Sequence, residues 1–300
     1  MDQVTTTAPA GQQPLWRRIA NFPLVAMLIG FAVYMLGIAL AVVATQFAMP
    51  RIAGFTNEMR FDLVAAPLLI ILYALIIRQL GEHKRNDLRL PGALKELSMG
   101  VGAGLVVFSL VVAVAAAIGV YRVTGEGDTG GLLPALIGPA IFAAVSEEML
   151  FRGILFRWIE EFGGSWAALV VTSALFGAAH LLNPGATILA AVGIAFEAGV
   201  LLGAAYMLTR SLWLPMGIHA AWNFTQGEIF DVPVSGTHVH GLLVARLSGP
   251  PLLTGGRFGL EASLIAMVVA TLCGLTLLWL AIRKGELMRP WWVRRRVAAT

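Results

Sequence analysis

The sequence has little charge and almost no cysteine, and both shortages narrow its class. Only 13% of the 300 residues are Asp, Glu, Lys or Arg, while 58% are hydrophobic. An ordinary soluble domain is about 25% charged, so a soluble globular protein of the usual kind is excluded. The single cysteine, Cys273, lies in an apolar run. The chain therefore has neither a disulfide framework nor a cysteine zinc site.

Long apolar runs take the place of charged surface. Runs near or above 18 residues are long enough, as helices, to cross a hydrocarbon core about 30 Å thick. They predict an all-α polytopic membrane protein with about eight transmembrane helices, at residues 22–49, 61–80, 94–120, 132–156, 165–182, 186–208, 211–226 and 258–283. The first run is too long for a cleavable signal peptide, so we expect it to stay as a helix. The seventh run is short and carries Pro215 and Gly217, so partial insertion is its alternative.

The positive charges follow the alternation that eight crossings require. With a cytoplasmic N-terminus, 16 of the 21 Lys and Arg residues fall on the cytoplasmic side. The positive-inside rule thus predicts that both termini are cytoplasmic. Because the basic residues are scattered among the loops, the net charge of +4 is interpreted as a topology signal, and nucleic acid is not expected as a partner.

The composition predicts one transmembrane domain between two tails. Residues 1–21 are interpreted as a disordered cytoplasmic tail, 22–284 as the domain with an intramembrane polar site, and 285–300 as a basic cytoplasmic tail. The segment from about 227 to 257 contains Pro233, Gly236 and a Gly255-Gly256 pair, which is too broken for a helix. We expect this segment to fold back over the site from the outer side.

Three charged residues interrupt the fourth run: Glu147, Glu148 and Arg152. A charge at the centre of a spanning helix costs about 2.5 to 3.5 kcal/mol on insertion scales, so such residues indicate function. Glu148 and Arg152 are four residues apart with the acid first, the favourable order for an ion pair on one helix face. Glu147 then points elsewhere, toward the bundle interior, and is the candidate general base. A purely structural ion-pair network is the alternative.

Further polar residues occupy the next three runs. His180 ends the fifth run, four residues after Phe176. His219 and Asn223 are also four residues apart, so both lie on one helix face, where an imidazole and an amide can donate hydrogen bonds to an oxyanion. The alternative is that they only pair with each other. Glu197 is an intramembrane carboxylate that either holds a histidine in one tautomer or serves in packing or in an ion pair.

These stretches together resemble the CPBP family of intramembrane proteases, which includes the CAAX prenyl endopeptidases of the Ras-converting type and bacteriocin-processing and immunity proteins. The family pattern is Glu-Glu-x-x-x-Arg, then Phe-x-x-x-His, then His-x-x-x-Asn. The chain matches it without departure at 147–152, 176–180 and 219–223. Each motif is short, but three in order within apolar runs are specific. The resemblance covers about residues 132–226, the predicted protease core.

The resemblance implies an intramembrane endopeptidase. Glu147 would activate a water molecule with the help of His180, while His219 and Asn223 would stabilise the oxyanion. Glu148 and Arg152 would be supports. The implied partners are a peptide or lipidated-peptide substrate and membrane lipid, and the implied location is the bacterial inner membrane.

Other functions stay open beside this one. A zinc-dependent metalloprotease would use Glu147, His180 and His219 as ligands, with an open position for water. We favour metal-free activation of water, because the His-Glu-x-x-His helix of zinc peptidases is absent. A proton-relaying transporter and a non-catalytic membrane scaffold are the competing classes.

Overall fold

Helices account for most of the chain, as the long apolar runs require, because only internally hydrogen-bonded backbone is stable in hydrocarbon. The computed structural model describes residues 14–298 apart from 48, 52, 83 and 239–240. The helices are α1 (Leu15–Ala20), α2 (Pro23–Phe47), α3 (Asn57–Leu75), α4 (Ala93–Ala117), α5 (Leu132–Ala135), α6 (Ala143–Glu148), α7 (Arg157–Gly163), α8 (Ser165–Ala179), α9 (Ile188–Ile194), α10 (Val200–Thr209), α11 (Trp213–Phe224), α12 (Pro251–Thr254), α13 (Leu264–Arg283) and α14 (Trp291–Ala298).

Tighter and wider turns join several of these helices. Four segments are π-helical: η2 (Leu136–Phe142), η3 (Met149–Phe156), η5 (Ala195–Gly199) and η6 (Thr225–Ile229). Three are 3₁₀ turns: η1 (Ile77–Gln79), η4 (His180–Leu182) and η7 (Leu260–Ala262). Strands β1 (Tyr121–Glu126) and β2 (Leu243–Leu247) pair antiparallel, with Tyr121 opposite Leu247.

Within the described residues, seven helical stretches are long and apolar enough to cross a membrane. They are Pro23–Phe47, Asn57–Gln79, Ala93–Ala117, Leu132–Gly163, Ser165–Leu182, Ile188–Thr209 and Leu264–Arg283. These confirm the all-α polytopic membrane fold. The fourth stretch extends to Gly163, beyond the predicted end at 156, because η3 and α7 continue the helix. The weakest predicted run, 211–226, corresponds to α11 and η6, which are almost entirely buried.

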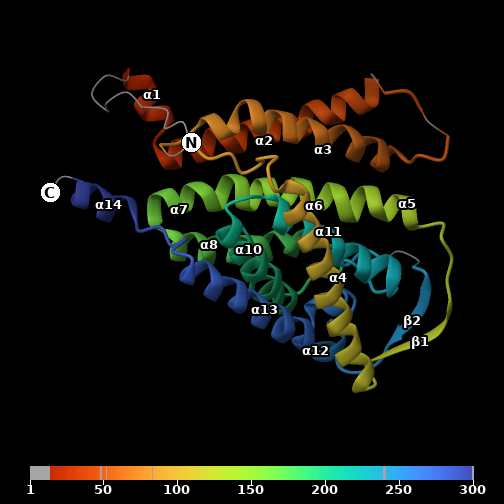
Figure 1. Cartoon of the computed structure of the whole chain (residues 1–300). Coiled ribbons are helices and arrows are strands. Elements are labelled where there is room, and N and C mark those ends of the chain that lie inside the picture. The colour runs from red at the N-terminus through yellow and green to blue at the C-terminus, as the bar shows by residue number, and fades with distance from the viewer. Residues whose placement is uncertain (1–13, 48, 52, 83, 239–240, 299–300) are drawn as a thin grey trace.

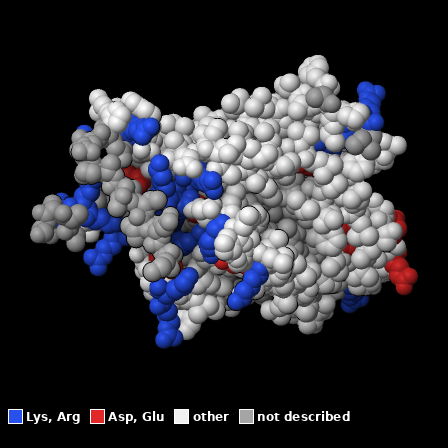
Figure 2. Space-filling view, turned by 45° about the horizontal axis from the view of Figure 1, so that its top comes forward, with Lys and Arg blue, Asp and Glu red and all other residues white. Residues whose placement is uncertain are grey.

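The two ends of the bundle differ in charge. Figure 1 shows α1 and α14 at one end and the antiparallel strand pair β1–β2 at the other. Lys and Arg side chains gather at the end that carries α1 and α14 (Figure 2). Part of each predicted tail is helical there, since α1 covers 15–20 and α14 covers 291–298, whereas residues 1–13 of the predicted disordered tail lie outside the described residues.

A close crossing of α4 and α11 fixes the helix that carries two of the site residues. A methyl group added to Gly100 would lie 2.4 Å from the Leu214 carbonyl oxygen, and one on Gly104 would lie 2.4 Å from that of Ile218. Only glycine allows the two backbones to approach so closely, as in the small-residue contacts of membrane helices. Figure 1 shows α4 running across α11.

Candidate active site

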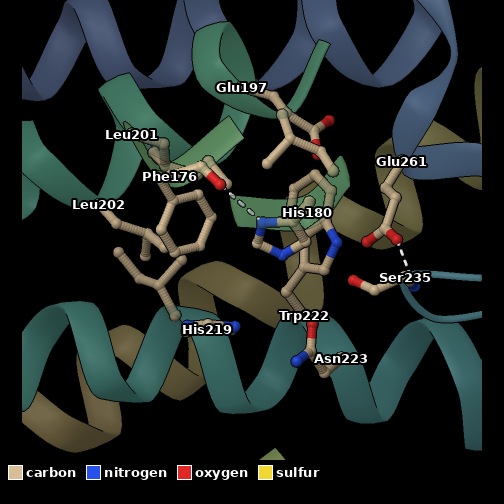
Figure 3. Close-up of a pocket in the computed structure, with 13 residues that line it drawn as sticks. Phe176, His180, Glu197, Leu201, Leu202, His219, Trp222, Asn223, Ser235 and Glu261 are labelled. Carbon is tan, nitrogen blue, oxygen red and sulfur yellow. Dashed lines mark hydrogen bonds between the residues drawn. The ribbon is translucent and has the colours of Figure 1, made fainter. Parts of the chain in front are cut away.

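A small buried cavity lies between η4, η5, α11 and η7 (Figure 3). Its volume is about 30 Å³, which is room for one or two water molecules. Aliphatic and aromatic side chains form most of its wall. Its polar lining residues are His180, Glu197, His219, Asn223, Ser235 and Glu261. The motifs of the fifth and seventh predicted runs therefore converge on one site.

His180 presents one ring nitrogen for chemistry. It begins the 3₁₀ turn that ends α8, and its Nδ1 lies 2.8 Å from the carbonyl oxygen of Phe176. A carbonyl oxygen only accepts, so Nδ1 carries the proton. In the neutral ring Nε2 is then the acceptor, as a base requires.

Glu148 holds the second histidine and the arginine. Its side chain is fully buried, and its Oε1 accepts from Arg152 Nη1 at 2.8 Å and from His219 Nδ1 at 3.0 Å. The ion pair expected from the spacing is thus confirmed. Arg152 also donates to the carbonyl of Ala198 at 3.1 Å, and its guanidinium lies 4.7 Å from the centre of the Phe176 ring. The aromatic residue of the second motif therefore covers the arginine of the first.

Asn223 is anchored from the other side. Its Nδ2 donates to the carbonyl oxygen of Pro139 at 2.8 Å. Because His219 donates to Glu148 instead, the alternative in which His219 and Asn223 only pair with each other is wrong. One hydrogen on Nδ2 of Asn223 is left over for another acceptor.

The π-helical segments explain how these contacts arise. The π turn η3 begins directly after Glu148, η5 contains Glu197 and the carbonyl that Arg152 uses, and η2 contains Pro139. A π turn bonds i to i+5 and shifts the carbonyls and side chains that follow it, which is why such turns occur often at functional sites. Helical periodicity in the sequence gave no sign of them.

Glu147 is placed differently from its neighbour. It is half-buried, it does not line the cavity, and it lies within electrostatic range of Tyr34 on α2 as well as of Arg152 and His219. Its Oε2 is buried with no hydrogen-bond partner among the described residues. The carboxylate forms no ion pair with a described residue, and it lies off the cavity wall.

Glu197 is on the wall but holds no histidine. It is 1% exposed, and its Oε2 has no partner among the residues that the structure describes. The tautomer of His180 is set by Phe176 and the bonded nitrogen of His219 by Glu148. The predicted role of Glu197 as a tautomer holder is therefore wrong.

Sequence reasoning missed Ser235 and Glu261. Ser235 has a left-handed backbone (φ 48°), and its N–H donates to Glu261 Oε1 (Figure 3). Burial raises the pKa of Glu261 from 4.5 to about 7, even though this hydrogen bond and the charge of His219 oppose the shift. The only sequence signal was a carboxylate directly before the last apolar run. As expected, the loop that carries Ser235 folds over the site.

The zinc alternative was tested against this arrangement. In the part of the chain that the structure describes, no three His, Cys, Asp or Glu side chains form a group that could hold a metal ion. Glu147 is off the wall that His180 and His219 share. Among the described residues, Glu147, His180 and His219 are therefore not grouped as ligands of one zinc ion.

Comparison with protein-family models gives a match over part of the chain. Residues 129–225 match the family model described as type II CAAX prenyl endopeptidase Rce1-like. The matched segment contains all three motifs and ends before Ser235 and Glu261. Comparisons with curated proteins and with solved structures each give no match.

Proposed function

Because residues 129–225 form an Rce1-like domain, and this family consists of intramembrane proteases, we propose that the cavity provides the water for hydrolysis of a peptide bond. The observation that carries the proposal is the convergence of His180, His219 and Asn223 on one cavity of water size inside the membrane-spanning bundle. Hydrolysis needs an activated water, an oxyanion site and a proton for the leaving amine.

The residues divide these tasks. Water held at His180 Nε2 loses a proton as its oxygen bonds to the carbonyl carbon. Because Glu147, the first glutamate of the motif, lies off the cavity wall, we assign that proton to it by way of a second water, for which the cavity has room. The unpaired Oε2 of Glu147 supports the assignment. The oxyanion accepts from the remaining hydrogen on Nδ2 of Asn223 and from Nε2 of a protonated His219, whose charge Glu148 balances. The C–N bond then breaks, and the amine receives the proton.

The substrate is a peptide in or at the membrane. A prenylated CAAX-type peptide is the candidate that the family description supports. The charge difference between the two ends supports a cytoplasmic location for both termini and an outer location for the strand pair β1–β2. A bacterial inner membrane is the setting that we propose.

Cleavage of a peptide library by purified protein in detergent tests the proposal. The library contains free and farnesylated peptides, and the variants are Glu147→Gln, Glu197→Gln and, as an exposed control on β1, Glu126→Gln. We expect Glu147→Gln to lower kcat by about 100-fold or more, the usual contribution of a general base. The Glu126→Gln control should match the parent.

Three results would count against this mechanism. Full activity of Glu147→Gln, together with loss of activity in Glu197→Gln, would show that the general base is Glu197 on the cavity wall and not Glu147. Cleavage activity that is lost in the presence of a chelator and restored by zinc would identify a metalloprotease. Cleavage by neither parent nor variants, with substrate still bound, would favour a non-catalytic scaffold.

A further inference from the structure

A second, larger cavity lies at the basic end of the bundle and shares no lining residue with the candidate active site. Its volume is about 520 Å³. Four arginines and one glutamate line it: Arg85, Arg210, Arg289, Arg294 and Glu286. We call it the basic cleft. It is built by the loop before α4, the turn between α10 and α11, and the segment that joins α13 to α14.

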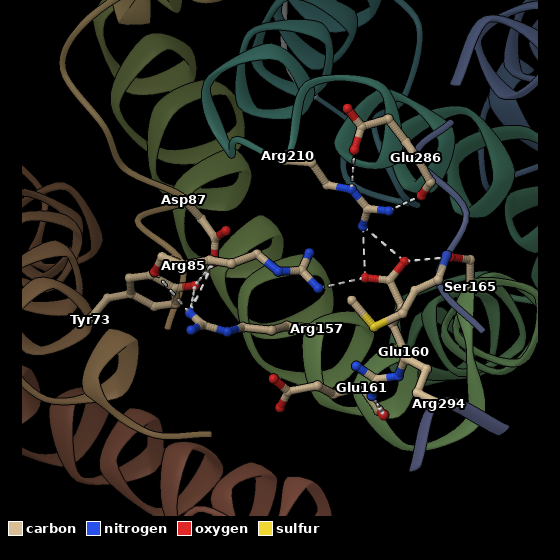
Figure 4. Close-up of polar contacts among 11 residues, drawn as sticks. Tyr73, Arg85, Asp87, Arg157, Glu160, Glu161, Ser165, Arg210, Glu286 and Arg294 are labelled. Carbon is tan, nitrogen blue, oxygen red and sulfur yellow. Dashed lines mark hydrogen bonds and ion pairs between the residues drawn. The ribbon is translucent and has the colours of Figure 1, made fainter. Parts of the chain in front are cut away.

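A buried carboxylate forms the base of the basic cleft. Glu160 on α7 is fully buried and accepts from Arg85 Nη2 at 3.0 Å and from Arg210 Nη1 at 2.7 Å (Figure 4). Arg210 also donates from Nε to Glu286 Oε2 at 3.1 Å. These ion pairs hold both arginines in fixed directions, so the cleft is a built feature and not a chance gap between mobile side chains.

Hydrogen bonds also fix the wall opposite. Ser165 donates its N–H to the carbonyl of Met288 at 3.0 Å, and its hydroxyl oxygen accepts the N–H of Met288 at 2.8 Å. Arg210 has a left-handed backbone (φ 55°), a conformation that is unfavourable for a non-glycine residue. Its two carboxylate partners offset that cost.

The basic cleft carries more positive than negative charge. The lining side chains comprise four arginines against one glutamate, and Glu160 beneath adds one further negative charge. Arg289 is exposed and forms no ion pair with a described residue. Arg85 Nη1 is buried with no acceptor among the described residues, so it does not face the open cleft. An anion in the cleft would supply the partner that Arg289 lacks.

Aromatic side chains place the basic cleft at the level of lipid headgroups. Trp291 and Trp292 begin α14. The ring centroid of Trp291 lies 5.9 Å from that of Phe22, and the ring centroid of Trp292 lies 5.8 Å from that of Phe162. Tryptophan is enriched at the interface between hydrocarbon and water. The anionic leaflet of a membrane attracts basic residues at that depth, and guanidinium groups bind phosphate with parallel hydrogen bonds.

We propose that the basic cleft binds the phosphate of an anionic phospholipid headgroup, through Arg289 in a frame held by Arg85, Arg210 and Glu160. The same chemistry would suit free phosphate, but the interfacial tryptophans favour a lipid. This inference does not depend on the proposed peptidase activity.

Native mass spectrometry of the full-length protein released from detergent tests the proposal. The protein is titrated separately with phosphatidylglycerol, with phosphatidylcholine and with inorganic phosphate. We expect one molecule of phosphatidylglycerol per chain to bind saturably and more tightly than phosphatidylcholine. Arg289→Gln should weaken its binding about fivefold, the usual contribution of one basic residue near an anionic membrane surface, and Arg289→Glu should weaken it further.

A matched control distinguishes a specific lipid-binding site from a general effect of positive charge. Arg296→Gln removes the same charge from an exposed position on α14 outside the basic cleft, and it should change lipid affinity less than twofold. Equal loss in Arg296→Gln and Arg289→Gln, at unchanged unfolding temperature, would overturn the proposal. So would equal affinity for the two lipids. Displacement of the lipid by equimolar inorganic phosphate would assign the cleft to a free anion instead.

Discussion

Glu147 and Glu148 are adjacent in sequence, yet the structure gives them opposite surroundings. Glu148 accepts from Arg152 and His219 and is fully buried, whereas the Oε2 of Glu147 has no partner among the described residues. The helix turns about 100° between them. One carboxylate is thus committed to structure and the other is available for chemistry, so their variants should fail in different ways.

Replacing Glu148 should first cost stability. Glu148→Ala leaves Arg152 buried without its carboxylate, and breaking a buried ion pair costs about 3 to 5 kcal/mol. Thermal unfolding in detergent should therefore begin at a clearly lower temperature than in the parent. Glu147→Ala, the neighbouring control, removes no ion pair and should unfold close to the parent. Equal unfolding temperatures for the two variants would contradict this assignment.

Glu261 should make stability depend on pH. Its pKa is about 7 in the folded protein and 4.5 without burial. Its contribution to stability is complete below pH 4.5 and is lost as pH rises toward 7, because only the unfolded chain releases the proton in that window. The loss is at most about 3 kcal/mol, from 1.36 kcal/mol per pKa unit.

Unfolding in detergent at pH 5 and pH 8 measures this dependence. Glu261→Gln should reduce the difference between the two pH values, and Glu126→Gln, which is exposed on β1, should keep it. If Glu261→Gln retains the full difference, another group carries the pH dependence.

At the scale of elements, the α4–α11 crossing should control activity from outside the site. A methyl group at Gly104 would lie 2.4 Å from the carbonyl oxygen of Ile218 and 2.9 Å from the Ala221 methyl, so Gly104→Ala must push α11 away. His219 and Asn223 move with that helix. A misplacement of about 1 Å can cost about 100-fold in rate.

Gly102 provides the matched control for this prediction. A methyl group there meets nothing within 4 Å, and alanine favours a helix by about 1 kcal/mol over glycine. Peptide cleavage should therefore fall in Gly104→Ala and stay at the parental rate in Gly102→Ala, with folding checked by unfolding temperature. Equal rates in the two variants would show that the crossing does not position the site.

The spanning elements were predictable because lipid imposes a length and a polarity on each of them. The motifs also predicted the Glu148–Arg152 pair and two histidines at one site. The sequence did not reveal the π turns, since a wider turn at Met149 or Ala195 leaves no periodic pattern. Glu261 could not be assigned, because only the folded loop brings Ser235 and η7 together at the cavity. The distance of Glu147 from the cavity likewise depends on those turns.

For the whole molecule, the charge difference between the two ends predicts orientation. Cys273 is the single cysteine, so a Cys273→Ser background allows one new cysteine to be labelled at a time. In intact cells a membrane-impermeant maleimide should label Thr129→Cys, which lies just after β1. It should not label Arg296→Cys on α14, because the positive-inside rule predicts that α14 is cytoplasmic. Permeabilised cells should label both. The reverse pattern in intact cells would invert the topology.

The candidate active site has room for only one or two water molecules, so water there is a reactant in limited supply and not a bulk solvent. In the proposed mechanism each hydrolysis consumes one of them, so the cavity must be refilled between successive cleavages. Refilling is then a step of the catalytic cycle with a rate of its own.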